Sequence, residues 1–87
     1  MMAKEVRGFL EDKSGRRPFV LRVSDPQKSD AGDYFCEIAL PAVAAIGPKL
    51  KIFGVDAAQA SNLALKFVRH MLSPMKVFDE KGRPMKI

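Results

Sequence analysis

The fold of this chain is decided by one stretch, Gly54-Val55-Asp56-Ala57-Ala58-Gln59-Ala60. The carboxylate of Asp56 can accept the free backbone N–H groups of a first helical turn, which makes this residue a strong N-cap. Gln59, three residues further on, can reach back to the N-cap N–H and complete a capping box. The stretch therefore predicts that a helix begins at Asp56.

Behind that start runs the one sustained helical periodicity of the sequence, which predicts a helix over about 56–73. One face of this helix is apolar and carries Ala57, Ala60, Leu63, Ala64, Phe67, Val68 and Met71. Leu65 and Leu72 widen the apolar sector beyond what contact with a single sheet needs. The excess indicates a second packing partner, either the C-terminal tail or another subunit.

Four segments are predicted to be strands, three of them because their residues alternate as those of a half-buried strand do. They span residues 5–11, 19–23, 34–40 and 49–53. Turn formers around Gly15 separate the first two segments and predict a hairpin. Residues 24–32 are interpreted as a polar surface loop, 41–48 as an apolar loop or short helical turn, and 75–87 as a short hairpin or extended tail.

These elements predict an α+β fold, in which an antiparallel four-stranded sheet in chain order carries one long helix on one face. The chain has 87 residues, enough for a single domain over 1–87. A domain of this size has a thin margin of stability. Because Cys36 is the one cysteine, no internal disulfide can form, and self-association is the expected source of further stability.

Composition favours a cytoplasmic protein that does not enter a membrane. The lone cysteine favours a reducing compartment. The first residues turn charged at once, unlike a signal peptide, and the longest nearly apolar run, 38–47, is too short for a membrane span. The net charge of +5 favours acidic partners, although charge alone specifies neither a fold nor a partner.

Strand parity divides the predicted sheet into two faces. Turned toward the helix are Phe19, Leu21, Val23, Tyr34, Cys36, Ile38, Leu50 and Ile52. Turned away are Arg7, Phe9, Val20, Arg22, Phe35, Glu37, Lys51 and Phe53. The candidate binding residues on the second face are Arg7, Phe9, Arg22, Phe35, Lys51 and Phe53.

Two interpretations of this second face remain open. Three phenylalanines interleaved with three cations form the kind of platform on which unpaired bases stack. The simpler interpretation, which we favour, is that the C-terminal hairpin or a symmetric partner covers this face.

The sequence contains no set of residues typical of an enzyme. His70 is the one histidine and Cys36 the one cysteine, whereas a metal site or a general base needs partners. The glycines follow neither the dinucleotide nor the Walker spacing. Gly54 precedes a helix N-terminus, where an anion can bind, but the carboxylate of Asp56 would fill that position. We therefore predict no enzymatic activity, no cofactor and no metal.

The run 52–65, Ile-Phe-Gly-Val-Asp-Ala-Ala-Gln-Ala-Ser-Asn-Leu-Ala-Leu, resembles a pattern found in small uncharacterised bacterial α+β proteins. That pattern is a strand, then Gly-x-Asp-x-x-Gln-Ala, then a helix containing Leu-Ala-Leu. Similar segments occur in some immunity-type proteins of bacterial toxin systems. The resemblance implies a bacterial α+β domain of unknown function and carries over no catalytic residues.

Three functions compete. The leading hypothesis is a non-enzymatic module for protein–protein interaction or self-association, either as a homodimer or with another protein, because helix and sheet carry surplus apolar surface. The first alternative is single-stranded nucleic-acid binding through the six candidate residues. The second alternative, which the resemblance implies, is an immunity or antitoxin-like protein.

Overall fold

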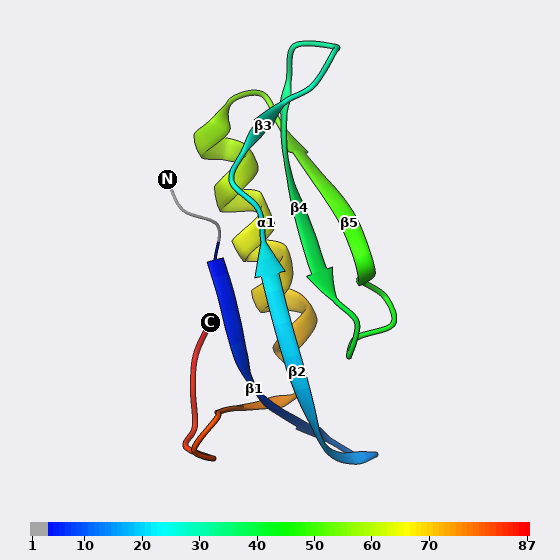
Figure 1. The fold of residues 1–87 in the computed structure, drawn as a ribbon, viewed down its shortest axis with the longest axis vertical. Coiled ribbons are helices and arrows are strands. Elements are labelled where there is room, and N and C mark those ends of the chain that lie inside the picture. Colours follow the sequence, from blue (N-terminus) through cyan, green and yellow to red (C-terminus); the bar gives the residue numbers. More distant parts are fainter. Residues whose placement is uncertain (1–3) are drawn as a thin grey trace.

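Six strands and one helix make up the structure, a computed structural model that describes residues 4–87. The strands are β1 (Lys4–Asp12), β2 (Gly15–Val23), β3 (Gln27–Lys28), β4 (Tyr34–Leu40), β5 (Gly47–Gly54) and β6 (Lys76–Asp79), and the helix is α1 (Ala57–Leu72). Every strand pairing is antiparallel. The predicted α+β class is confirmed, with α1 lying along one face of the sheet (Figure 1).

The four long strands lie in the order β1, β2, β4, β5, as the sequence predicts. The β1–β2 hairpin pairs along its whole length, from Lys4 opposite Val23 to Asp12 opposite Gly15. Strand β4 pairs with β5 along one edge, and its other edge is shared by β2 and β3. Strand β6 adds to the free side of β1.

The prediction of four strands is wrong in number, because two short strands complete the sheet. Strand β3 falls in the section predicted as a surface loop and has two residues, too few to show alternation. Strand β6 lies in the tail, where Asp79 N–H donates to the Arg83 carbonyl and Phe78 bridges to Pro84. The predicted C-terminal hairpin is therefore present, but its first arm belongs to the main sheet.

The predicted helix start is confirmed, with one difference in the cap. Asp56 Oδ1 accepts the Gln59 N–H at 2.8 Å. The Gln59 side chain reaches back, but its Oε1 accepts the N–H of Val55 at 2.7 Å, one residue before the N-cap. Both contacts satisfy backbone donors at the junction between β5 and α1. In residues 4–87, α1 is the one helix, and it is neither long nor apolar enough to cross a membrane.

The buried stripe of α1 differs in part from the predicted apolar face. It consists of Ala60, Ala64, Val68 and Leu72. Leu63, predicted to face the sheet, is 39% exposed, because it lies about 100° around the helix from Ala64. Leu72, predicted only to widen the apolar sector, is buried.

The sheet face predicted to point inward forms the core. Its members Phe19, Leu21, Val23, Cys36 and Ile38 are buried, and Tyr34, Leu50 and Ile52 pack against them. The tail adds Met85 and Ile87 to this core from the helix side, where Arg69 Nε donates to the Ile87 carbonyl at 2.7 Å. The tail is therefore a second packing partner of α1, which confirms one of the two predicted alternatives.

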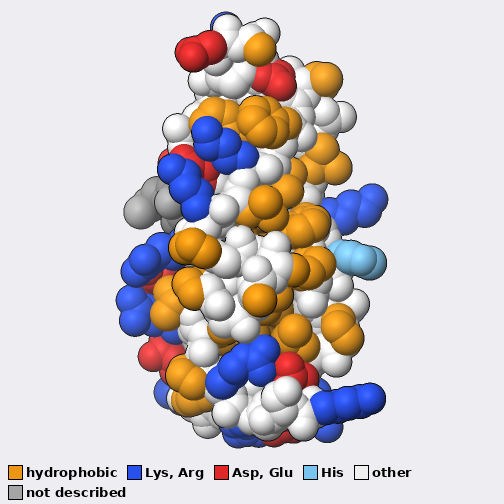
Figure 2. Space-filling view, turned by 90° about the vertical axis from the view of Figure 1, so that its right-hand side faces the viewer, with side chains coloured by type: hydrophobic (Ala, Val, Ile, Leu, Met, Phe, Trp, Pro, Cys, Tyr) orange, Lys and Arg blue, Asp and Glu red, His pale blue; other side chains and the backbone are white. Residues whose placement is uncertain are grey.

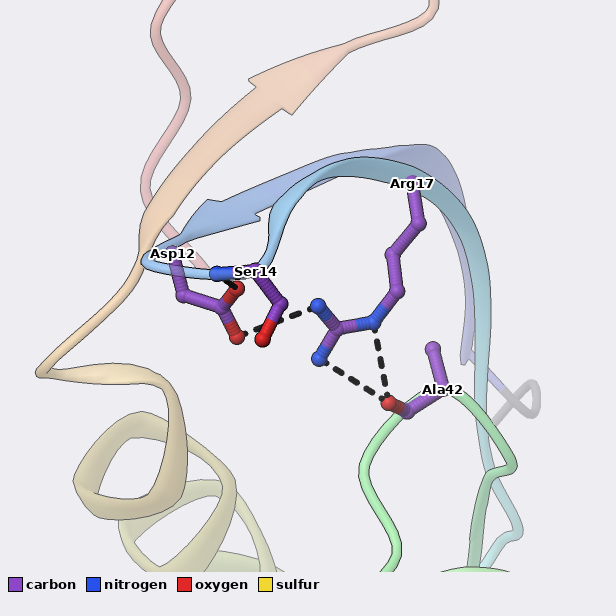
Figure 3. Close-up of polar contacts among 4 residues, drawn as sticks. All are labelled: Asp12, Ser14, Arg17 and Ala42. Carbon is purple, nitrogen blue, oxygen red and sulfur yellow. Dashed lines mark hydrogen bonds and ion pairs between the residues drawn. The ribbon is translucent and has the colours of Figure 1, made fainter.

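The side chain of Arg17 connects the β1–β2 turn to the loop after β4 through hydrogen bonds (Figure 3). Its Nε and Nη2 donate to the carbonyl of Ala42 at 3.3 and 3.2 Å, and its Nη1 donates to Asp12 Oδ2 at 3.0 Å. Asp12 also accepts the N–H of Ser14 at 2.8 Å. The Ser14 N–H and then the Arg17 guanidinium hold the pKa of Asp12 below its ordinary value.

We expect Arg17→Lys to lower the free energy of unfolding by about 1 kcal/mol, because an ammonium group cannot reproduce the forked contact with Ala42. Urea unfolding measures the change. The matched control is Arg83→Lys, whose exposed pair with Asp79 should make the change smaller than about 0.5 kcal/mol. Equal losses in the two variants would contradict the role given to Arg17.

Candidate binding face

The face of the sheet opposite α1, called the outer face below, carries every residue of the predicted binding site. Cross-strand partners share a face, and Arg7 lies opposite Val20 while Glu37 lies opposite Lys51. The residues that precede and follow each of these positions along the strands are turned to the opposite face, where they belong to the core or pack against it. Strand parity therefore gives the correct orientation for the predicted site.

Two of the predicted phenylalanines form a cluster on β4 and β5. The ring centroids of Phe35 and Phe53 are 5.5 Å apart, with the ring planes tilted by 43°. The Nζ atom of Lys51 lies 4.7 Å from the centroid of the Phe35 ring. Phe53 remains 49% exposed. The cluster is thus an accessible apolar patch with a cation held on it.

The third predicted phenylalanine, Phe9, belongs to a separate cluster. It lies opposite Pro18 on β2 and opposite Phe78 on β6. The guanidinium of Arg16 covers the Phe78 ring, 4.2 Å from its centroid. Sequence reasoning missed Phe78 and Arg16 because it did not place the tail in the sheet. The apolar pair Val77-Phe78 was the signal that a strand was present.

Arg7 and Arg22 do not stand as two free cations, because both contact Glu5. The Nε of Arg22 donates to Glu5 Oε1 at 2.7 Å, and the Nε of Arg7 donates to Glu5 Oε2 at 3.3 Å. The hydrogen bond from Arg22, followed by that from Arg7, holds the pKa of Glu5 below its ordinary value. All three side chains are exposed, so the pairs leave them accessible to a partner.

A shallow hollow of about 490 Å³ opens beside these charged residues. It lies where β2 and β4 pair over only two positions, and Ala39 contributes a small side chain there. Arg22, Glu37 and Lys49 line it, with Lys49 Nζ 3.1 Å from Glu37 Oε2. The hollow is a place where a partner's side chain can enter the outer face.

Cations outnumber carboxylates on the outer face. The cations are Arg7, Arg16, Arg22, Lys49, Lys51 and Lys76, and the carboxylates are Glu5, Glu11 and Glu37. Each of these carboxylates already forms an ion pair with a cation of the same face. The strands of the outer face therefore carry a net positive charge.

The tail does not cover the outer face. Met85 and Ile87 pack against the core, and the Ile87 carbonyl contacts Arg69 of α1. The expectation that the C-terminal hairpin covers the outer face is therefore wrong for the part of the chain that is described. The reason is that the arm after the turn at Asp79–Arg83 continues beside Val77 toward the helix, where Met85 N–H donates to the Val77 carbonyl.

The two candidate reactive side chains lie in different surroundings. Cys36 is fully buried in the core, and burial raises the pKa of its thiol. His70 is exposed on α1. Within residues 4–87, no three His, Cys, Asp or Glu side chains gather as a metal site requires.

Comparisons with protein-family models, with curated proteins and with solved structures found no match to this chain. The resemblance to small bacterial α+β proteins and to immunity-type proteins therefore stays a prediction. The geometry and charge of the outer face are the observations that bear on function.

Proposed function

We propose that this protein is a non-enzymatic binding module that docks an acidic partner protein on its outer face. The observation that carries the proposal is the pairing of exposed aromatic surface at Phe53 with a surplus of cations on the same face. Apolar surface supplies the energy of association, and the cations steer an acidic partner to it.

Protein binding accounts for the aromatic side chains better than base stacking does. A base stacks on a free ring face, whereas Lys51 lies over Phe35 and Arg16 lies over Phe78. Binding of single-stranded nucleic acid stays the alternative outcome of the experiment below.

Charge also favours a different protein over a second copy at this face. In a two-fold dimer a patch meets itself, so the surplus cations of one copy would face those of the other. Such like-charge contact opposes association, whereas a partner rich in carboxylates gains from it. The predicted homodimer remains a separate prediction, which sedimentation equilibrium tests for any surface of the molecule.

Site-specific photo-crosslinking in cells of the source organism tests the proposal. A benzophenone amino acid replaces Phe53 on the outer face or, as the control, Asn62 on the exposed side of α1. We expect a discrete acidic protein to be captured at position 53 and not at position 62. Capture of nucleic acid at position 53, or equal capture of one protein at both positions, would contradict the proposal.

The double variant Arg22→Glu, Lys51→Glu provides a second check with the same crosslinker at position 53. Reversing two charges of the outer face should reduce capture at least about tenfold, because the partner is recognised through its carboxylates. Each new glutamate lies opposite a carboxylate, Glu5 or Glu37, and such a pair costs about 0.2–1 kcal/mol. Thermal melting therefore verifies that the double variant is folded before capture is compared. Undiminished capture by a folded double variant would show that outer-face charge plays no part.

A further inference from the structure

The geometry points to strand addition at the free edge of β5. We infer that an extended segment of the acidic partner pairs with β5, placing acidic side chains beside Lys49 and Lys51 and apolar side chains in a groove beside α1. This inference rests on the proposed function, because it names the contact through which the acidic partner docks. Strand addition is a common way for an edge strand to bind a peptide.

Strand β5 is an edge of the sheet (Figure 1). Its residues pair with β4, and no strand in residues 4–87 pairs with its other side. An unpaired edge presents a row of backbone donors and acceptors to a partner strand.

The hydrogen bonds of Glu37 show which backbone groups of β5 are free. Glu37 N–H donates to Ser24 Oγ at 2.8 Å, and the Glu37 carbonyl accepts the Ser24 N–H at 2.9 Å. Both groups of Glu37 therefore point away from β5, so its partner Lys51 belongs to a non-hydrogen-bonded pair. The N–H and carbonyl of Lys51 consequently point to the free edge, and alternation extends this to Phe53. It does not extend to Lys49, because the register of the β4–β5 pair shifts between Leu50 and Gly47.

An apolar groove lies beside this edge, on the helix side of the sheet. Ile52, Leu63 and Phe67 line it, Lys66 and His70 stand at its rim, and its volume is about 390 Å³. Figure 2 faces the β5 side of the molecule and shows hydrophobic side chains gathered along it, with Lys and Arg side chains on both flanks. The groove accommodates apolar side chains that project from an added strand.

A strand paired with β5 would present its side chains alternately to the outer face and to the groove. Residues opposite Lys49 and Lys51 would lie beside those lysines, where opposite charges stabilise a cross-strand pair. Residues opposite Leu50 and Ile52 would lie on the groove side, where burial favours apolar side chains. The edge thus fits a segment that alternates acidic and apolar residues.

The same lysines disfavour a second copy of this chain at the edge. Antiparallel pairing of β5 with itself about Lys51 places Lys51 opposite its own copy, and pairing about Leu50 places Lys49 opposite Lys51. Like charges directly opposite each other destabilise a sheet, and edge lysines prevent such self-pairing in many proteins. The lysines of β5 therefore disfavour pairing with a second copy of β5 and favour pairing with an acidic strand.

A synthetic eight-residue peptide that alternates glutamate and valine is the probe. Two control peptides replace glutamate by lysine or collect the four glutamates before the four valines. Nuclear magnetic resonance of the labelled full chain follows amide hydrogen exchange. We expect the alternating acidic peptide to slow exchange at Lys51 and Phe53 at least about tenfold, because it hydrogen-bonds these amides. Binding of this peptide without slower exchange at these two amides would overturn strand addition.

Two variants at position 51 separate backbone pairing from charge. Lys51→Gln removes the positive charge of the side chain and keeps the backbone N–H that points to the free edge. Lys51→Pro removes both the charge and this N–H. Proline is tolerated where the lost N–H points away from the sheet. We expect peptide affinity to fall severalfold in Lys51→Gln and at least a further tenfold in Lys51→Pro, with circular dichroism showing that both fold. Equal affinities of the two folded variants would also overturn strand addition.

Arg22→Glu distinguishes this failure from failure of the proposed function, since Arg22 lies on β2, away from the β5 edge. If Arg22→Glu weakens binding of the acidic peptide while the two variants at position 51 bind equally, docking on the outer face stands without strand addition. If Arg22→Glu has no effect and the two position-51 variants also bind alike, both proposals fail.

Discussion

The variant Gly54→Ala should lose more than about 3 kcal/mol of unfolding free energy, a large part of what a small domain has. A Cβ atom at this position would stand 2.5 Å from the nitrogen of Ala60 and 2.9 Å from the carbonyl carbon of Gln59. These atoms belong to the backbone of the first turn of α1 and cannot move aside as a side chain does. Overpacking in a core costs about 1–3 kcal/mol, and a collision with backbone at a short junction exceeds that range.

Because Gly54 ends β5 and α1 begins three residues later, the collision would push the helix off the sheet and loosen the buried stripe that starts at Ala60. Urea unfolding followed by circular dichroism measures the loss. Val55→Ala is the matched control, since Val55 is 74% exposed and should change stability by less than about 0.5 kcal/mol. Wild-type stability of Gly54→Ala would show that α1 does not pack as closely on β5 as described.

The second large effect is expected for Gly8→Ala. A Cβ atom here would stand 2.0 Å from the carbonyl oxygen of Phe78 and 3.2 Å from the Phe19 ring. Gly8 pairs with Asp79 at the end of the β1–β6 ladder, so β6 must leave its place to admit the methyl group. We expect a loss of about 2–4 kcal/mol, because a strand and its contacts with the core are displaced.

The loss in Gly8→Ala should be local, which amide hydrogen exchange reveals. Exchange should accelerate in β6 while β4 and β5 keep their protection. The control is Gly15→Ala, where φ is +109° and a Cβ meets no atom within 4 Å. It should cost about 1 kcal/mol of backbone strain and leave exchange in β6 unchanged. Unaltered exchange in β6 of Gly8→Ala would contradict the close approach of the two strands.

The parts of the fold that could be predicted are those marked by residues that lie close together in the sequence. Asp56 and Gln59 mark a helix start within four residues, and a period of two marks three of the four long strands. By contrast, the contact between Arg17 and the Ala42 carbonyl joins segments that no local pattern connects. The packing reason for Gly54 likewise depends on where the first turn of α1 lies.

The sequence predicted which face of the sheet carries the candidate site, but it did not predict how the residues are grouped on that face. Period-two alternation placed all six residues on the outer face, because parity needs no knowledge of neighbouring strands. Their division into a Phe35–Phe53 cluster and a Phe9 cluster depends on the lateral order of strands and on β6. The sharing of Glu5 by Arg7 and Arg22 depends on the β1–β2 register. The grouping of residues on the outer face follows from the pairing of neighbouring strands, which the sequence pattern does not specify.

The central claim is that the outer face, together with the free edge of β5, docks an acidic partner. Amide hydrogen exchange of the chain, alone and bound to the protein captured at position 53, tests it most directly. We expect slower exchange at Lys51 and Phe53, and unchanged exchange around Asn62 on the exposed side of α1. Protection confined to α1, with exchange in β5 unaltered, would contradict the claim.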